Sequence, residues 1–159
     1  MVNTFLAVMV VIAALVGWLW WRSRSYRNAM IRKSDEIAAR YDGEQLVALY
    51  NYGLMDLHTA AYMQNRGELG PPPVSPYRLL ELVVGFWVRK EQLSGNPAPE
   101  RRDIRVPLFR AIQKVLGDKD YALVKCMHLF TDHGERAPNV SDEWVEEEWI
   151  RIKREYDEI

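Results

Sequence analysis

Residues 4–21 read TFLAVMVVIAALVGWLWW and contain no charged side chain. At a rise of about 1.5 Å per residue, a helix of this length measures roughly 27 Å, close to the thickness of the hydrocarbon core of a bilayer. The stretch is apolar on every face, which makes a buried helix of a soluble protein a lesser alternative. The sequence therefore predicts a single N-terminal transmembrane helix, residues 1–21.

The end of this stretch carries side chains that favour a membrane interface. Tryptophan is enriched at bilayer interfaces and arginine on the cytoplasmic side. The candidate interface residues are Trp18, Trp20, Trp21, Arg22, Arg24 and Arg27. Because nothing basic except the α-amino group precedes the stretch, we expect the N-terminus outside and the rest of the chain in the cytoplasm at an inner or plasma membrane. In a mitochondrial membrane the same rule places the rest in the matrix.

A cleaved signal peptide is the weaker interpretation of the same residues. No charged side chain precedes the apolar run, and the residues after it are not a small-residue cleavage site. Within the run, Ala13 and Gly17 are four residues apart, a spacing that allows two membrane helices to approach closely. They are candidates for a helix–helix contact. The alternative is that both residue types are simply common in membrane helices.

The rest of the chain predicts one small all-α domain. Hydrophobic residues make up 48% of the 159 residues, with six Trp and eight Tyr, which favours a packed core over disorder. The formal net charge of −1 gives no support to nucleic-acid binding. We expect residues 22–43 to form a basic juxtamembrane helical stalk, and residues 44–159 a cytoplasmic all-α domain of about five helices.

Apolar periodicity places these helices. Residues 44–66 repeat apolar side chains at three- and four-residue steps, with Gly53 on the apolar face, where it can admit a close neighbour. Residues 77–93 are too short for a second span and predict the most buried helix. A segment lying in the membrane interface is the alternative. Pro107 suits the first turn of a helix over residues 107–116.

Two further helices complete the domain. We expect residues 118–131 to form one, and Ser141 is a good N-cap for the last. The last helix has a narrow apolar seam suited to one partner helix, most simply inside its own domain. The seam residues are Val145, Trp149, Ile152 and Tyr156.

One cluster has metal-ligating or nucleophilic chemistry: Cys126, His128, Asp132 and His133. His128 and Asp132 would share a helix face, but Cys126 would point elsewhere, which weakens a four-ligand site. The chain contains no Cys-x-x-Cys, His-Glu-x-x-His or Glu-x-x-His spacing and no phosphate-binding glycine loop. We therefore assign no metal, cofactor or catalytic residue, and keep the cluster as a weak metal candidate.

The expected function follows from an anchor joined to a helical body without a catalytic signature. We expect a non-enzymatic scaffold or accessory subunit that contacts the lipid bilayer and binds a protein partner or a second copy of itself. The alternatives are a membrane-tethered regulator or sensor, including a phage-type inner-membrane protein, and a metal-dependent enzyme that uses the Cys126–His133 region. The basic residues Arg101, Arg102 and Arg105 could pair with the acidic run at 146–148, within the molecule or between copies.

Overall fold

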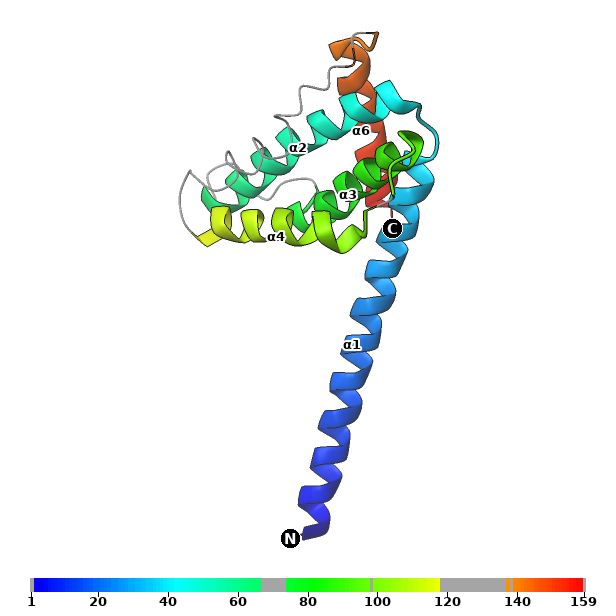
Figure 1. Cartoon of the computed structure of the whole chain (residues 1–159). Coiled ribbons are helices and arrows are strands. Elements are labelled where there is room, and N and C mark those ends of the chain that lie inside the picture. Colours follow the sequence, from blue (N-terminus) through cyan, green and yellow to red (C-terminus); the bar gives the residue numbers. More distant parts are fainter. Residues whose placement is uncertain (1, 67–73, 98, 118–136, 138, 159) are drawn as a thin grey trace.

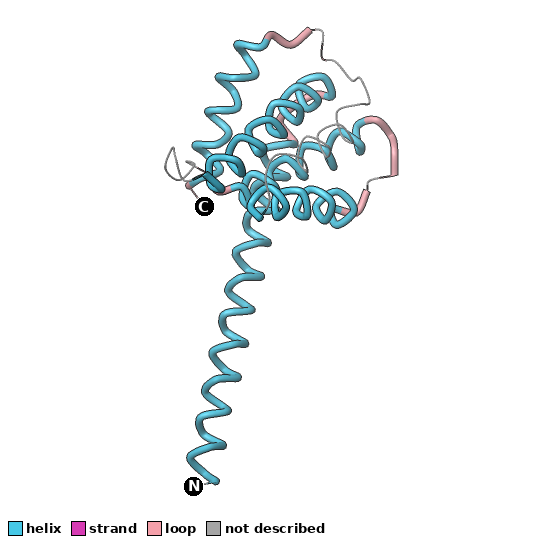
Figure 2. The backbone as a smooth tube through the Cα atoms, turned by 90° about the vertical axis from the view of Figure 1, so that its left-hand side faces the viewer, coloured by secondary structure: helices cyan, strands magenta, loops and turns pink. Residues whose placement is uncertain are grey.

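The computed structural model describes residues 2–66, 74–97, 99–117, 137 and 139–158. In this part of the chain the secondary structure consists of helices, without a strand, which confirms the all-α prediction (Figures 1 and 2). The helices are α1 (Val2–Ala38), α2 (Gly43–Arg66), α3 (Pro76–Leu93), α4 (Arg101–Gly117) and α6 (Asp142–Asp157).

The helix α1 extends far outside the domain formed by the other helices (Figure 1). Its 37 residues join the predicted anchor and the predicted stalk in one uninterrupted helix. Among the described residues, α1 is the helix long and apolar enough to cross a membrane, and its apolar window has no buried residue. Large side chains along it are open to the surroundings: Leu6 is 60% exposed and Trp21 is 63% exposed.

The centre of the domain is α3, which packs against α1, α2 and α4. Ser75 caps α3 by accepting a hydrogen bond from the backbone N–H of Arg78, and Pro76 occupies the first turn. All residues from Leu79 to Phe86 are buried. The stretch at 77–93 is therefore a core helix of the domain rather than a segment lying in the membrane interface.

The last helix closes the core over α2. Ser141 caps α6, and its hydroxyl accepts a hydrogen bond from the backbone N–H of Trp144. The seam predicted for a partner helix is buried within the domain: Val145, Trp149, Ile152 and Tyr156. Trp149 lies against Gly53, where an added Cβ would come within 2.6 Å of the indole. The close neighbour expected at Gly53 is this tryptophan.

The start of α4 differs from the prediction. The helix begins at Arg101, so Pro107 lies inside it and not in its first turn. A proline in a helix interior removes one backbone donor and is unfavourable by itself. Side chains of the first α4 turns bind α1 and α3, and these tertiary contacts offset that cost. The helix expected over residues 118–131 lies outside the described residues.

Candidate functional site

The candidate site among the described residues is the junction where α1 enters the domain. The face of α1 that becomes buried consists of Met30, Ser34, Ile37 and Ala38, and Tyr41 follows in the turn after the helix. These residues recur at three- and four-residue steps, which place them on one helix face. Side chains from 6 to 28 are all exposed. The junction therefore starts about two and a half helical turns after the tryptophan-rich end of the apolar run.

Two small residues bring α1 and α3 together at the junction. Ser34 is completely buried, and its hydroxyl donates a hydrogen bond to the carbonyl oxygen of Glu81 at 3.0 Å. Gly85 lies opposite Ser34: a Cβ added to Gly85 would overlap the Ser34 hydroxyl and approach the Ser34 Cβ at 3.1 Å. The absence of a side chain at Gly85 thus permits a close helix–helix approach.

A buried carboxylate fixes α4 to the same place. Glu81 is only 2% exposed, and its Oε1 pairs with the guanidinium of Arg105. The other carboxylate oxygen lies 3.8 Å from Arg101, which also pairs with Asp35 of α1 and lies 3.5 Å from the carbonyl oxygen of Ile31. A buried charge of this kind is tolerated only with partners, so it makes the position of α4 dependent on α1 and α3. These arginines do not pair with the acidic run at 146–148 in the described contacts; they pair with Glu81 and Asp35.

A second set of ion pairs joins α1 to α6. Glu155 receives two hydrogen bonds from Arg40, at 2.6 and 2.7 Å, and an ion pair from Lys33 at 2.7 Å. The hydrogen bonds from Arg40 and then from Lys33 lower the pKa of Glu155 to about 2. All three side chains are partly exposed, so the ion pairs orient α6 on α1 more than they stabilise the fold.

Tyr41 extends this set at the end of α1. Its hydroxyl donates to the carboxylate of Glu148, which also pairs with Arg151. Hydrogen bonding from Arg151 is the main cause that lowers the pKa of Glu148. Burial, and then the bond to Glu148, raise the pKa of Tyr41, which keeps the phenol protonated as a donor.

Residues 6–28 form the free length of α1, outside the domain. The predicted membrane-interface residues lie on this free length and face outward. The guanidinium of Arg22 lies over the ring of Trp18, and that of Arg24 over Trp20, each 5.2 Å from the ring centroid. A shallow hollow of about 190 Å³ lies between Trp20, Ser23, Arg24 and Arg27. Aromatic and cationic groups that share one surface can contact both the acyl boundary and the phosphates of a bilayer.

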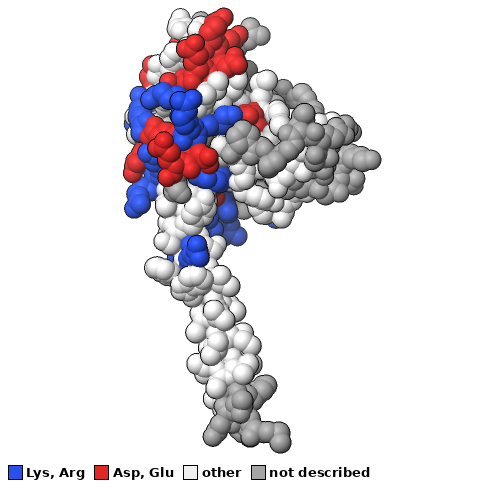
Figure 3. Space-filling model, turned by 180° about the vertical axis from the view of Figure 1, so that it is seen from behind, with Lys and Arg blue, Asp and Glu red and all other residues white. Residues whose placement is uncertain are grey.

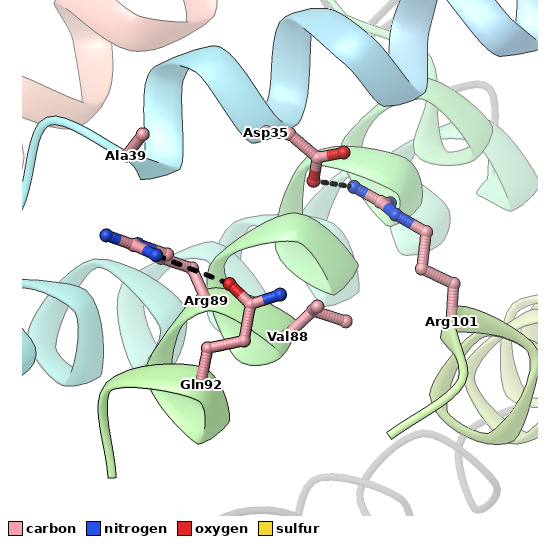
Figure 4. Close-up of a pocket in the computed structure, with 6 residues that line it drawn as sticks. All are labelled: Asp35, Ala39, Val88, Arg89, Gln92 and Arg101. Atoms are coloured by element: carbon pink, nitrogen blue, oxygen red, sulfur yellow. Dashed lines mark hydrogen bonds and ion pairs between the residues drawn. The ribbon is translucent and has the colours of Figure 1, made fainter. Parts of the chain in front are cut away.

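A larger hollow of about 330 Å³ lies between α1, α3 and the first residue of α4 (Figure 4). Arg89 and Gln92 form one wall and are 3.4 Å apart, while the Asp35–Arg101 ion pair forms the other. Within the described part of the chain, Nε of Arg89 is buried without a hydrogen-bond partner. The residues that line this hollow are Asp35, Ala39, Val88, Arg89, Gln92 and Arg101.

The remaining predicted sites have different positions. Ala13 and Gly17 are exposed on α1, and a Cβ at Gly17 would meet nothing within 4 Å. The weak metal candidates Cys126, His128, Asp132 and His133 lie outside the described residues. Among the described residues, no group of three or more His, Cys, Asp or Glu side chains could hold a metal ion.

Sequence reasoning missed the junction itself, although two signals were visible. Glu81 and Gly85 are the two residues that interrupt an otherwise apolar run. In the structure one binds the arginines of α4, and the other makes room for Ser34. Their partners, Arg101, Arg105 and Ser34, are 20 to 51 residues away along the chain, so periodicity within one helix could not identify them.

The fold and the junction define an all-α domain built onto the end of one long apolar helix. No family model, curated protein or solved structure matches this chain.

Proposed function

We propose that the chain is a membrane-anchored, non-enzymatic scaffold or accessory subunit. In this proposal α1 crosses a membrane with its N-terminus outside, and the helical domain binds a protein partner at the cytoplasmic face. The observation that carries the proposal is the continuity of α1. One helix passes from an exposed apolar length directly into the core of the domain, so an inserted α1 would hold the domain at a defined height and orientation.

Exposure of the apolar length supports membrane insertion. Side chains from Leu6 to Trp21 are exposed on all sides of the helix, and the large hydrophobic ones are about half exposed or more. Soluble monomers rarely expose contiguous apolar patches larger than a few hundred Å². A lipid environment removes this cost, and the following arginines then remain at the interface.

The charge at the far end of the domain supports the proposal of a protein partner. Acidic side chains gather there, at the end farthest from the free length of α1 (Figure 3). The exposed acidic residues of α6 are Asp142, Glu143, Glu146 and Glu147. Ile150, 48% exposed, adds an apolar side chain on the same helix. An acidic rim around an exposed apolar side chain suits a partner surface with basic residues.

A combined fractionation and purification experiment tests this function. The full chain, tagged at its C-terminus, should require detergent for extraction, and the tag should be digested by protease only from the cytoplasmic side. A partner in fixed stoichiometry should co-purify and be lost on reversal of Glu143, Glu146 and Glu147 to lysine. Neutralisation of Arg154 to glutamine is the matched control on the same helix. A protein that purifies alone as a monomer would contradict the accessory-subunit function.

A further inference from the structure

The helix α4 lies along the edge of the domain from which α1 projects, and it runs crosswise to α1 (Figure 1). Its first residue, Arg101, binds α1 at the carbonyl oxygen of Ile31 and at Asp35. Ile31 follows Trp21 by ten residues, which corresponds to roughly 15 Å along a helix. α4 is therefore held beside the part of α1 that would leave the bilayer.

The two faces of α4 differ in chemistry. Ile104, Leu108, Ala111 and Ile112 are buried against the domain, where α4 packs on α2 and α3. The opposite face is exposed and points away from these helices. Its residues are Arg102, Asp103, Arg110, Gln113 and Lys114, with the half-buried Val106 among them. Basic side chains outnumber acidic ones on this face.

These basic side chains differ from the other cations of α4 in having no ion-pair partner among the described residues. Arg101 and Arg105 lie in the first and second turns of α4, on its other side. They form ion pairs with Asp35 and Glu81. In contrast, Arg102, Arg110 and Lys114 form no ion pair with the described residues. α4 thus separates cations that fix it to the junction from cations that face outward.

We propose that the outward face of α4, through Arg102, Arg110 and Lys114, binds the anionic phospholipid headgroups of the bilayer that α1 crosses. The proposal rests on the membrane insertion of α1 proposed above. A helix with its side chains has a radius of about 5 Å. Subtracting this radius from the roughly 15 Å between Ile31 and Trp21 brings the outward cations to roughly 10 Å from the level of Trp21. That distance falls within the headgroup layer plus one Debye length of about 8 Å, the distance over which salt screens the headgroup charge.

The position of the acidic surface favours lipid over a second copy of the chain. The acidic N-terminal half of α6 lies at the end of the domain away from the free length of α1, whereas α4 lies at the near edge (Figures 1 and 3). Two copies anchored in one bilayer have equal heights, so the acidic end of one does not face α4 of its neighbour. The negative surface of the bilayer does face α4.

Fluorescence quenching in lipid nanodiscs tests the proposal with the full chain. A fluorophore on Gln113→Cys, in a chain with Cys126→Ser, reports the outward face of α4, and one on Glu147→Cys reports the far end of the domain. The quencher is a nitroxide attached to a lipid headgroup. We expect quenching at position 113 in discs of phosphatidylcholine with 30% phosphatidylglycerol, less quenching in pure phosphatidylcholine, and loss of the difference in 1 M NaCl. Position 147 should stay unquenched in all of them.

Charge removal gives the quantitative arm of the test. A basic residue near an anionic surface contributes about 1 kcal/mol, which is about fivefold in the ratio of bound to free domain. The triple change Arg102→Gln, Arg110→Gln and Lys114→Gln should therefore lower that ratio by roughly a hundredfold. The control is Arg154→Gln, an exposed cation of α6 at a distance from α4, which should leave quenching at position 113 unchanged.

The outcomes separate this inference from the proposed function. A chain that does not float with lipid vesicles contradicts membrane anchoring itself. A chain that floats, but whose position 113 is equally quenched with and without phosphatidylglycerol, contradicts lipid binding by α4. Quenching that follows the number of copies per disc, and not lipid charge, assigns the face to a second copy and overturns the proposal.

Discussion

Residues 6–28 and residues 30–38 belong to the same helix but have different surroundings. Side chains in the first length are all exposed, and as far as Trp21 they are apolar on every side. In the second length only one face is buried, while Arg32, Asp35 and Glu36 remain exposed. Backbone geometry is the same in both lengths, so the distribution of side chains decides what each length can contact.

The difference shows how one helix can serve two apolar environments. An apolar surface on all sides suits lipid, which has no preferred face. An apolar stripe with charged flanks suits a protein core on one side and water on the other. Substitutions in one length should therefore affect membrane association and leave the fold intact, and substitutions in the other should do the reverse.

The largest expected effect comes from charge in the first length. Val11→Lys with Leu15→Lys places two cations on one face of α1, each unfavourable by about 3 kcal/mol at the centre of a bilayer, or about 6 kcal/mol together. We expect loss of the chain from the detergent-extracted membrane fraction, while the thermal unfolding of the domain followed by circular dichroism is unchanged. Val11→Leu with Leu15→Ile is the control. Retention of the lysine variant in membranes would contradict insertion of this length.

The next largest effect belongs to the domain core. Trp149 is fully buried, lies against Gly53 and donates its indole N–H to Asp56 at 2.8 Å. Trp149→Ala removes this contact area and leaves a cavity, which should lower the free energy of unfolding by about 3–5 kcal/mol. Urea unfolding of the detergent-solubilised chain measures the change. Trp18→Ala, on the exposed length of α1, should leave the domain's unfolding midpoint unchanged, and equal losses in both variants would contradict the division of α1.

A smaller effect is expected at the contact between α1 and α3. Gly85→Ala introduces a Cβ that overlaps the hydroxyl of Ser34, and the overpacking should cost about 2 kcal/mol. Adding Ser34→Ala removes the overlapping oxygen but leaves the Cβ contact at 3.1 Å, so it should restore only part of the stability. Gly17→Ala, with open space around it, is the matched control and should not lower the unfolding temperature. A stable Gly85→Ala single variant would show that the helices are not closely packed there.

The parts of the fold that sequence predicted are those governed by neighbouring residues. The uninterrupted apolar run predicted the long N-terminal helix, and Ser141 predicted the start of α6. Helical spacing placed the seam that contains Trp149 and put Gly53 on the inner face of α2. Each of these depends on residues a few positions apart, so the chain itself carries the signal.

The parts that sequence did not predict depend on distant residues. α4 begins six residues before Pro107 because Arg101 and Arg105 bind α1 and α3, and no pattern within α4 announces those partners. Likewise, the role of Gly85 depends on Ser34, 51 positions earlier in the sequence. The junction therefore depends on how the helices pack against one another, which no local pattern in the sequence specifies.

The smallest expected effect concerns pH, and it arises where α6 contacts the second length of α1 and the turn that follows it. The pKa of Glu155 is about 2 in the folded chain, against about 4.3 for a free glutamate side chain, because Arg40 and Lys33 bind its charged form. A lowered folded pKa stabilises the fold above pH 4.3, and the contribution is lost as pH falls from there toward 2. The groups are partly exposed, so we expect Glu155→Gln to cost about 1 kcal/mol at pH 7 and almost nothing at pH 2.

Thermal unfolding at several pH values measures how the stabilities of the unmodified chain and of Glu155→Gln converge as the pH falls. The control is Glu147→Gln, at an exposed position outside the ion pairs of the described residues, which should follow the unmodified chain throughout. If Glu155→Gln stays less stable by the same amount at pH 2, its effect comes from packing and not from the charges that join α6 to α1.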